Sequence, residues 1–136
     1  MSRVTDKHKA DDEDASALRF GSTFQDEESQ TAMLTISEVK LLLENIEAQG
    51  KVPDSTVYNK TKEYVETFAR FHDYEVVQTV RNSLPQPEFQ SYEVVQMINL
   101  CPMESEEAKA LIPSIKVDDE PLQQHLDDLA AHRKQQ

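Results

Sequence analysis

The sequence is poor in the residues that define several common classes of protein: it has one cysteine, two glycines and no tryptophan. A single cysteine cannot close a disulfide within the chain, and no cysteine–histidine group has the spacing of a zinc site. So few glycines argue against an all-β fold, which needs many turn residues. No apolar run approaches the roughly 18 residues of a membrane span, and the first residues lack the apolar core of a signal peptide. We therefore expect a soluble intracellular helical protein with no metal site.

Acidic residues outnumber basic ones by 26 to 14, which leaves a formal net charge of −12. Binding to nucleic acid depends largely on Lys and Arg displacing counterions from phosphate, so this chain alone should bind RNA or DNA poorly. The acidic runs at 11–14 and 26–28 could recruit a basic partner or a divalent ion. Charge runs are more often solvated surface, and we favour that reading.

Several stretches of the sequence are rich in Leu, Glu, Lys and Gln, and their pattern predicts an all-α fold in four parts. Residues 1–16 are charged and almost free of large apolar side chains, which predicts a disordered acidic tail. Residues 17–34 carry apolar residues without helical period and predict an extended arm. Residues 35–72 predict a helical hairpin, and residues 73–136 an orthogonal bundle of short helices.

The hairpin has clear end signals. Thr35 and Glu38 have the capping-box spacing, and Gly50 followed by Pro53 stops the first helix. A second helix is predicted from an Asp54 cap to about Phe71. Its inward face is expected to hold Val57, Thr61, Tyr64, Val65, Phe68 and Phe71.

In the bundle, the first helix should begin after Asp73, end at Pro85 and bury Val76, Val77, Val80 and Leu84. The second should span about 88–100 and turn Phe89, Tyr92, Val95 and Ile98 inward. A third is expected over 105–111. The last should start near Asp118 or Asp119 and bury Leu122, Leu126 and Leu129.

The sequence offers no catalytic constellation. Its histidines, His8, His72, His125 and His132, are scattered, and none adjoins Cys101. With no cation beside it in sequence, Cys101 is predicted to be a buried structural residue rather than a reactive thiol. We expect no catalytic, cofactor-binding or metal-binding residues.

Two stretches have more apolar surface than one small core needs, and both predict a partner interface. The arm either crosses its own domain or adds to a partner as an extended segment. The first hairpin helix has an unusually broad stripe. The predicted interface residues are Leu18, Phe20, Phe24, Ile36, Val39, Leu42, Leu43 and Ile46.

One literal string goes further than these patterns: Asn-Leu-Cys-Pro at 99–102, followed by Lys-Ala-Leu-Ile-Pro-Ser at 109–114. It resembles the family of fourth subunits of eukaryotic RNA polymerase II. The segments 12–20, 35–43, 68–71 and 118–129 are similar to other parts of that family. The motif residues are read as structural: Asn99, Leu100, Cys101, Pro102, Leu111, Ile112 and Pro113. Unlike the family, the chain has Met103 or Glu104 where a Thr cap is common, so the capping box there is lost or shifted to Ser105.

The resemblance implies a non-catalytic stalk subunit of RNA polymerase II whose last part is HRDC-like. It implies an obligate heterodimer with the seventh subunit near the RNA exit and the clamp, and attachment to the polymerase core. Nascent RNA would be contacted mainly through the partner, with initiation, export and decay factors as further partners and no membrane. The expected location is the nucleus, with shuttling to the cytoplasm left open. The alternatives are a free-standing acidic helical adaptor and an HRDC-type nucleic-acid-binding module, which the charge opposes.

Overall fold

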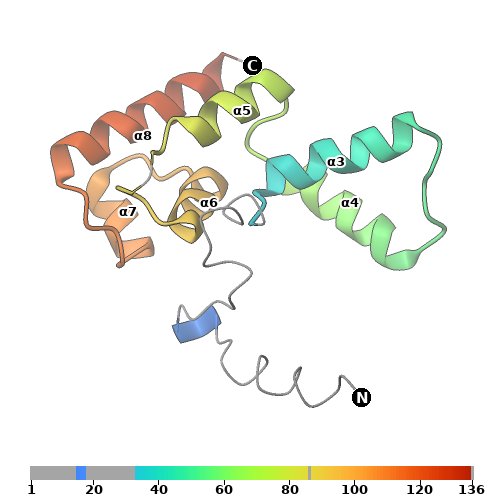
Figure 1. The fold of residues 1–136 in the computed structure, drawn as a ribbon, viewed down its shortest axis with the longest axis horizontal. Helices are drawn as coiled ribbons and strands as arrows, with labels where there is room; N and C mark the ends of the chain where they lie inside the picture. The colour runs from blue at the N-terminus through green and yellow to red at the C-terminus, as the bar shows by residue number, and fades with distance from the viewer. Residues whose placement is uncertain (1–14, 18–32, 86, 136) are drawn as a thin grey trace. The chain divides into compact units, whose positions relative to one another are not determined.

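The computed structural model describes residues 15–17, 33–85 and 87–135, and every regular element in these ranges is helical (Figure 1). The all-α prediction is confirmed. Leu34–Gln136 forms one compact unit, and before it the structure describes a single 3₁₀ turn, η1. The elements are η1 (Ala15–Ala17), α3 (Ile36–Ala48), α4 (Thr56–Phe68), α5 (Tyr74–Asn82), α6 (Ser91–Leu100), α7 (Ser105–Leu111) and α8 (Asp119–Lys134). The predicted disordered tail and extended arm lie almost wholly outside the described residues.

Both predicted ends of α3 are confirmed. The Thr35 hydroxyl accepts from the Glu38 amide, and the Glu38 carboxylate accepts from the Thr35 amide at 2.8 Å, which is a complete capping box. At the other end, Gly50 has φ +69°, a conformation that glycine adopts without a Cβ clash. The Gly50 and Lys51 amides donate back to the carbonyls of Glu47 and Ile46, so the chain closes α3 with a Schellman motif.

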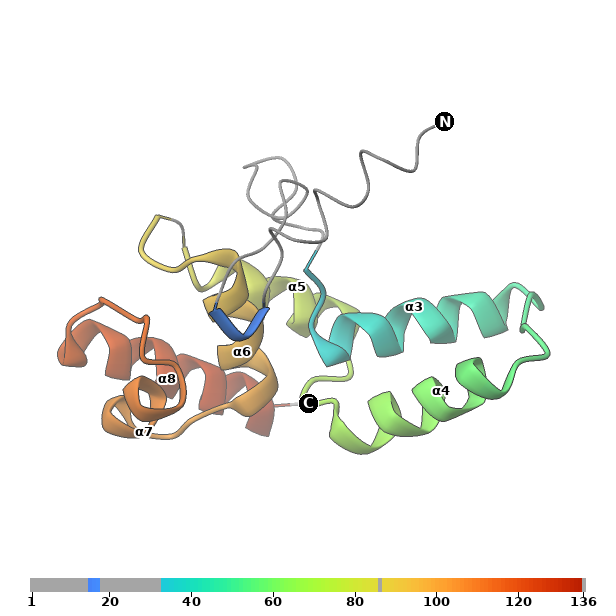
Figure 2. The same cartoon turned by 90° about the horizontal axis from the view of Figure 1, so that it is seen from below.

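Helix α4 lies beside α3 in both views of the fold (Figures 1 and 2), and the two helices are in direct contact. The Tyr58 hydroxyl lies 3.4 Å from the Leu43 carbonyl and 3.3 Å from a Glu47 carboxylate oxygen. Lys62 forms a 2.6 Å salt bridge with the same Glu47. Polar contacts therefore join the two helices of the hairpin in addition to side-chain packing.

The prediction for α4 was wrong in its cap and its end, and right for only part of its inward face, since Val65 and Phe71 are buried as predicted. Ser55, not Asp54, accepts from the Tyr58 amide, and the helix ends at Phe68 because Ala69 has an extended backbone. Tyr58 and Val65 are the buried residues of α4. Val57, Tyr64 and Phe68 are exposed, and Phe71 lies beyond the helix.

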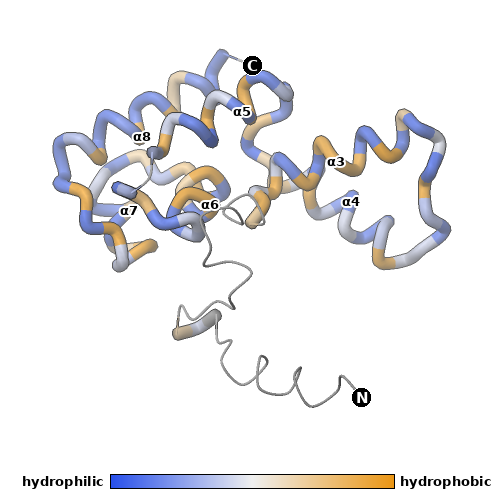
Figure 3. The backbone as a smooth tube through the Cα atoms, viewed as in Figure 1, coloured by the Kyte–Doolittle hydropathy of each residue, from blue (hydrophilic) through white to orange (hydrophobic). Residues whose placement is uncertain are grey.

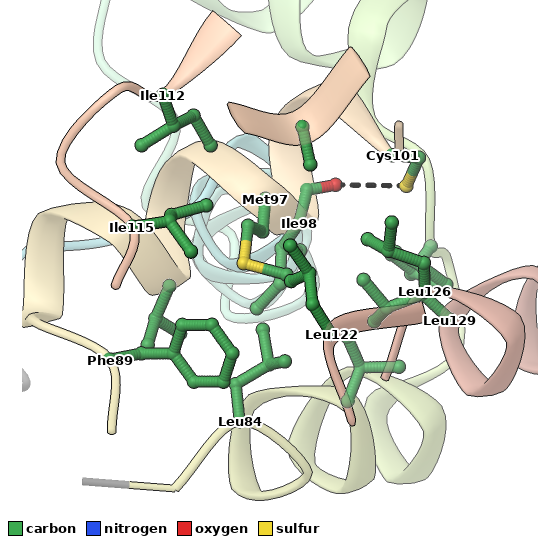
Figure 4. Close-up of a cluster of buried hydrophobic side chains, with 14 of the residues drawn as sticks. Leu84, Phe89, Met97, Ile98, Cys101, Ile112, Ile115, Leu122, Leu126 and Leu129 are labelled. Atoms are coloured by element: carbon green, nitrogen blue, oxygen red, sulfur yellow. Dashed lines mark hydrogen bonds between the residues drawn. The ribbon is translucent and has the colours of Figure 1, made fainter. Parts of the chain in front are cut away.

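The main core lies in the bundle that follows the hairpin, and Figure 4 shows part of it. Its buried residues come from α5 to α8 and their connections: Phe71, Val77, Val80, Leu84, Phe89, Val94, Met97, Ile98, Cys101, Ala108, Ile112, Ile115, Leu122, Leu126 and Leu129. The prediction for α8 is confirmed, since Leu122, Leu126 and Leu129 are buried. For α5, the Asp73 cap and the burial of Val77, Val80 and Leu84 are confirmed, whereas the helix ends at Asn82 rather than Pro85 and Val76 is only partly buried.

The prediction for α6 was wrong in two respects. The helix begins at Ser91, after Phe89, because Phe89 enters the core from the turn that precedes it. Its buried face contains Val94, Met97 and Ile98, whereas Tyr92 and Val95 are only partly buried. The buried Glu93 carboxylate is satisfied by the Gln90 amide at 2.8 Å and the Ser114 hydroxyl at 2.7 Å.

The start of α7 has no side-chain cap of its own, and Ser105 is not a cap residue. The Ser105 amide instead donates to the Gln123 side chain of α8 at 3.0 Å. The Gln123 amide nitrogen returns a hydrogen bond to the Met103 carbonyl at 3.0 Å. A residue of another helix thus replaces the capping box that the local sequence lacks.

Candidate subunit interface

The first turn of α3 is anchored to the bundle by Asn99, the first residue of the Asn-Leu-Cys-Pro string. Its side-chain oxygen accepts from the Ile36 amide at 2.9 Å, and its carbonyl accepts from the Arg70 side chain at 3.3 Å. The Ile36 amide is one of the donors that a helix N-terminus leaves without an intrahelical partner. Asn99 therefore completes α3 from a position 63 residues away.

Two further contacts reinforce this junction. The buried Ser37 hydroxyl accepts from the Phe71 amide at 3.1 Å. The Glu38 carboxylate accepts two hydrogen bonds from Arg81 of α5 in a forked pair, one of them at 2.7 Å. Burial of Glu38 opposes its ionisation, but the hydrogen bonds from Arg81 and the Thr35 amide outweigh it, and the pKa of Glu38 lies below its ordinary value.

This lowered pKa predicts how stability depends on pH. The native ion pair stabilises the fold above the ordinary glutamate pKa of about 4.3, and the stabilisation is lost as pH falls through the lower native value. Glu38→Gln should therefore lower the free energy of unfolding at pH 7 by about 1–3 kcal/mol, because Arg81 loses its charged partner. Urea titrations of both proteins at pH 7 and near pH 3 should show the difference shrinking in acid.

Glu44→Gln is the matched control, because the Glu44 side chain is about half exposed and pairs with Lys40 on its own helix in a 3.1 Å contact. It should change the unfolding free energy by less than about 0.5 kcal/mol. A Glu38→Gln difference that persists unchanged in acid would show that the ion pair is not its cause.

The apolar stripe predicted on α3 is incompletely covered within the described unit. No apolar residue of α3 is fully buried, and the buried positions at its start are Thr35 and Ser37. Leu42 is 49% exposed, whereas Ile36, Val39, Leu43 and Ile46 are partly buried. Figure 3, which colours the backbone by hydropathy, shows hydrophobic positions recurring along α3. Leu18, Phe20 and Phe24 lie outside the described residues. Among the described stripe residues, Leu42 is therefore the one that is exposed.

Helix α4 adds apolar surface that the sequence reasoning had assigned to the interior. Val57, Tyr64 and Phe68 are 74%, 55% and 50% exposed, and they lie at helical spacing on one side of α4. The rings of Tyr64 and Phe68 are 4.7 Å apart between centroids. The same 57–64–68 spacing predicted an apolar face correctly. It could not tell an inward face from an outward one.

The buried residues of the Asn-Leu-Cys-Pro motif and its continuation pack in the core of the bundle. Cys101 has φ +46°, its thiol donates to the Ile98 carbonyl at 3.2 Å, and burial raises its pKa. Pro102 and Ile112 are also buried, whereas Leu100, Leu111 and Pro113 are exposed. The thiol is therefore a poor nucleophile, because it holds its proton near neutral pH.

Within the described ranges, no three histidine, cysteine or carboxylate side chains are grouped so that they could hold a metal ion. No helix in those ranges has the length and apolar character needed to cross a bilayer. The feature that stands out is the uncovered apolar surface of the hairpin, anchored at one end to a well-packed bundle. This combination is typical of helical subunits of larger assemblies.

Residues 33–133 match the RNA polymerase Rpb4 family, and the chain belongs to this family. It is 39% identical over 131 residues to DNA-directed RNA polymerase II subunit rpb4 of Schizosaccharomyces pombe, which covers 90% of this chain and 93% of that protein. It is 32% identical to the Dictyostelium discoideum subunit rpb4, covering 91% of both chains. It is also 32% identical to RNA polymerase II subunit 4 of Arabidopsis thaliana, covering 88% of this chain and 93% of that one. The predicted resemblance is confirmed, and the chain is an RNA polymerase subunit that acts in transcription.

Proposed function

We propose that this chain is the non-catalytic stalk subunit of RNA polymerase II and forms an obligate heterodimer with the seventh subunit. The observation that carries the proposal is the hairpin surface, where α3 has no fully buried apolar residue and α4 exposes Val57, Tyr64 and Phe68. Solvent-exposed apolar patches of this kind are typical of permanent interfaces. The relatives named above are subunits of the same polymerase.

The interface would use the apolar stripe of α3 together with the arm. The stripe comprises Ile36, Val39, Leu42, Leu43 and Ile46, and the arm contributes Leu18, Phe20 and Phe24. The junction at Asn99 and Glu38 fixes the first turn of α3 against the bundle, so the stripe is presented from a rigid base. A rigid surface loses less entropy on association than a flexible one.

The net charge of −12 supports a division of labour within the heterodimer. This chain repels phosphate, so contacts with nascent RNA would be made mainly through the seventh subunit. The stalk would lie near the RNA exit and the clamp, support initiation, and present surfaces to initiation, export and decay factors. Its location would be the nucleus, with shuttling to the cytoplasm as a further possibility to be tested.

Purification of the endogenous protein at high salt tests the proposal. The seventh subunit should remain bound, because an apolar interface is not weakened by salt. Recovery of diverse soluble adaptors instead would favour the free-standing adaptor, and recovery of nucleic acid would favour the nucleic-acid-binding module.

An RNA titration provides the second measurement. The isolated chain should bind single-stranded RNA no more tightly than the roughly 10⁻⁴ to 10⁻⁶ M of non-specific binders, and the heterodimer should bind more tightly. Sub-micromolar binding by the isolated chain at physiological salt would contradict the proposed division of labour.

A further inference from the structure

A groove in the bundle, separate from the hairpin, has no part in the function proposed above. It has a volume of about 270 Å³ and lies between the turn after α6 and the second half of α8. Its lining residues are Cys101, Pro102, Met103, Leu126, Leu129, Ala130, Arg133 and Lys134. Figure 4 shows Cys101 beside Leu126 and Leu129 at one edge of the core cluster. The groove therefore opens directly onto the apolar core.

The backbone at Cys101 creates this opening. Its left-handed conformation ends α6 abruptly and turns the chain toward Met103, which is 57% exposed. From α8, residues 126, 129, 130, 133 and 134 share one helical face, so the apolar floor continues into a cationic end. Methionine is a flexible side chain that adapts to different apolar occupants.

The charge of the groove is opposite to that of the chain. Of the 26 acidic residues in the sequence, none is among the residues that line it, whereas Arg133 and Lys134 both are. Arg133 and Arg70 also lie close enough to Cys101 to favour its thiolate electrostatically. At its rim, the Glu107 carboxylate accepts from the Met103 amide at 3.2 Å. At physiological ionic strength the Debye length is about 8 Å, so distant carboxylates are screened and the local cations decide what binds.

We propose that this groove docks a short acidic peptide segment of a partner protein that carries large apolar side chains. The volume is just below the roughly 300–1,000 Å³ of pockets that enclose whole small molecules, and it suits one or two side chains of a peptide. Apolar anchors would enter beside Leu126 and Leu129, and carboxylates would face Arg133 and Lys134. This is the helix-in-groove mode of recognition, with charge fixing the orientation.

The test is a fluorescence anisotropy titration of the full chain at physiological salt. The probe is a short labelled peptide in which Leu and Phe repeat at helical spacing and Asp and Glu fill the remaining positions. Binding should saturate, and Arg133→Glu with Lys134→Glu should raise the Kd about tenfold. The matched control is Lys51→Glu with Lys60→Glu, which makes the same charge change at exposed positions outside the groove and should leave the Kd within about twofold.

Control peptides separate the two parts of the site. A peptide with Lys in place of Asp and Glu, and one with Ser in place of Leu and Phe, should each bind much more weakly. Equal binding of either one, an equal loss with the control variant, or no saturation up to about 1 mM would overturn the proposal. Thermal melts of both double variants confirm that folding is unchanged, because all four positions are exposed.

A deletion and the Arg133→Glu with Lys134→Glu variant show whether something other than a partner's peptide fills the groove. If deleting residues 1–32 tightens peptide binding, the groove is filled by this chain's own N-terminal segment. If light scattering shows a dimer that Arg133→Glu with Lys134→Glu dissociates, a second copy fills it. If the same reversal abolishes binding of single-stranded RNA, the ligand is nucleic acid. Each of these results would refute the peptide assignment.

Discussion

Phe71→Ala is expected to lower the free energy of unfolding by about 3–5 kcal/mol, the usual cost of removing a fully buried phenylalanine. Phe71 is 0% exposed and belongs to the bundle core, although it lies in the connection between α4 and α5. Its amide also donates to Ser37 at the junction, so the residue fixes the core and the start of α3 together. The loss is a large part of the roughly 5–15 kcal/mol that stabilises a domain, and thermal denaturation should show the midpoint falling by more than about 10 °C.

Phe68→Ala is the matched control, since it removes the same side chain three positions earlier. Phe68 is 50% exposed on α4, and its ring contacts Tyr64 rather than the core. Its substitution should cost less than about 1 kcal/mol in the isolated chain. Similar losses for both variants would mean that the two rings share one face, as the sequence pattern alone had suggested.

Leu42→Asp with Ile46→Asp should abolish association with the seventh subunit. In the proposed interface these changes place two carboxylates in a dry apolar contact, which costs at least about 4 kcal/mol, or about a thousandfold in Kd. Co-expression followed by affinity capture measures the loss. The bundle should keep its helical circular dichroism and its cooperative melt, because its core residues come from Phe71 to Leu129 and include neither Leu42 nor Ile46.

Asn45→Asp with Gln49→Asp provides a control of equal charge and equal spacing on the exposed side of the same helix end. Capture of the partner should be unaffected by it. Leu42→Asp alone serves as the cleaner single change, since Leu42 is half exposed whereas Ile46 is partly buried. If the partner is retained by both the single and the double variant, the stripe does not form the interface.

Local signals in the sequence were enough to place most helices. The capping box at Thr35, the stop at Gly50 and the Asp73 cap all act within a few residues, and each is present in the structure. The apolar period of α8 also identified its buried face, because Leu122, Leu126 and Leu129 have polar neighbours on every other side. Where a helix end is determined by nearby residues, the local sequence is sufficient to predict it.

What the sequence could not predict depends on distant residues. The stripes of α4 and α6 are apolar on more than one side, so their inward faces are decided by what packs against them. For α7 the end is completed by Gln123 of another helix, and for α3 the first amide is satisfied by Asn99. The candidate interface was predicted on the arm and α3 but not on α4, because the exposed side chains of α4 have the same spacing as a core face.

The anchoring of α3 has a consequence for the order of events during synthesis. The first turn of α3 is held by residues 34, 43 and 63 positions further along the chain. At about 5–20 residues per second, a ribosome needs roughly 3–13 s to extend the chain from Ile36 to Asn99. Until Asn99 is made, the Ile36 amide lacks its partner and the core cluster is incomplete, so the apolar side chains of the hairpin can contact another surface. Docking of α3 is therefore a late step of folding, and early capture of the nascent hairpin by another protein would compete directly with it.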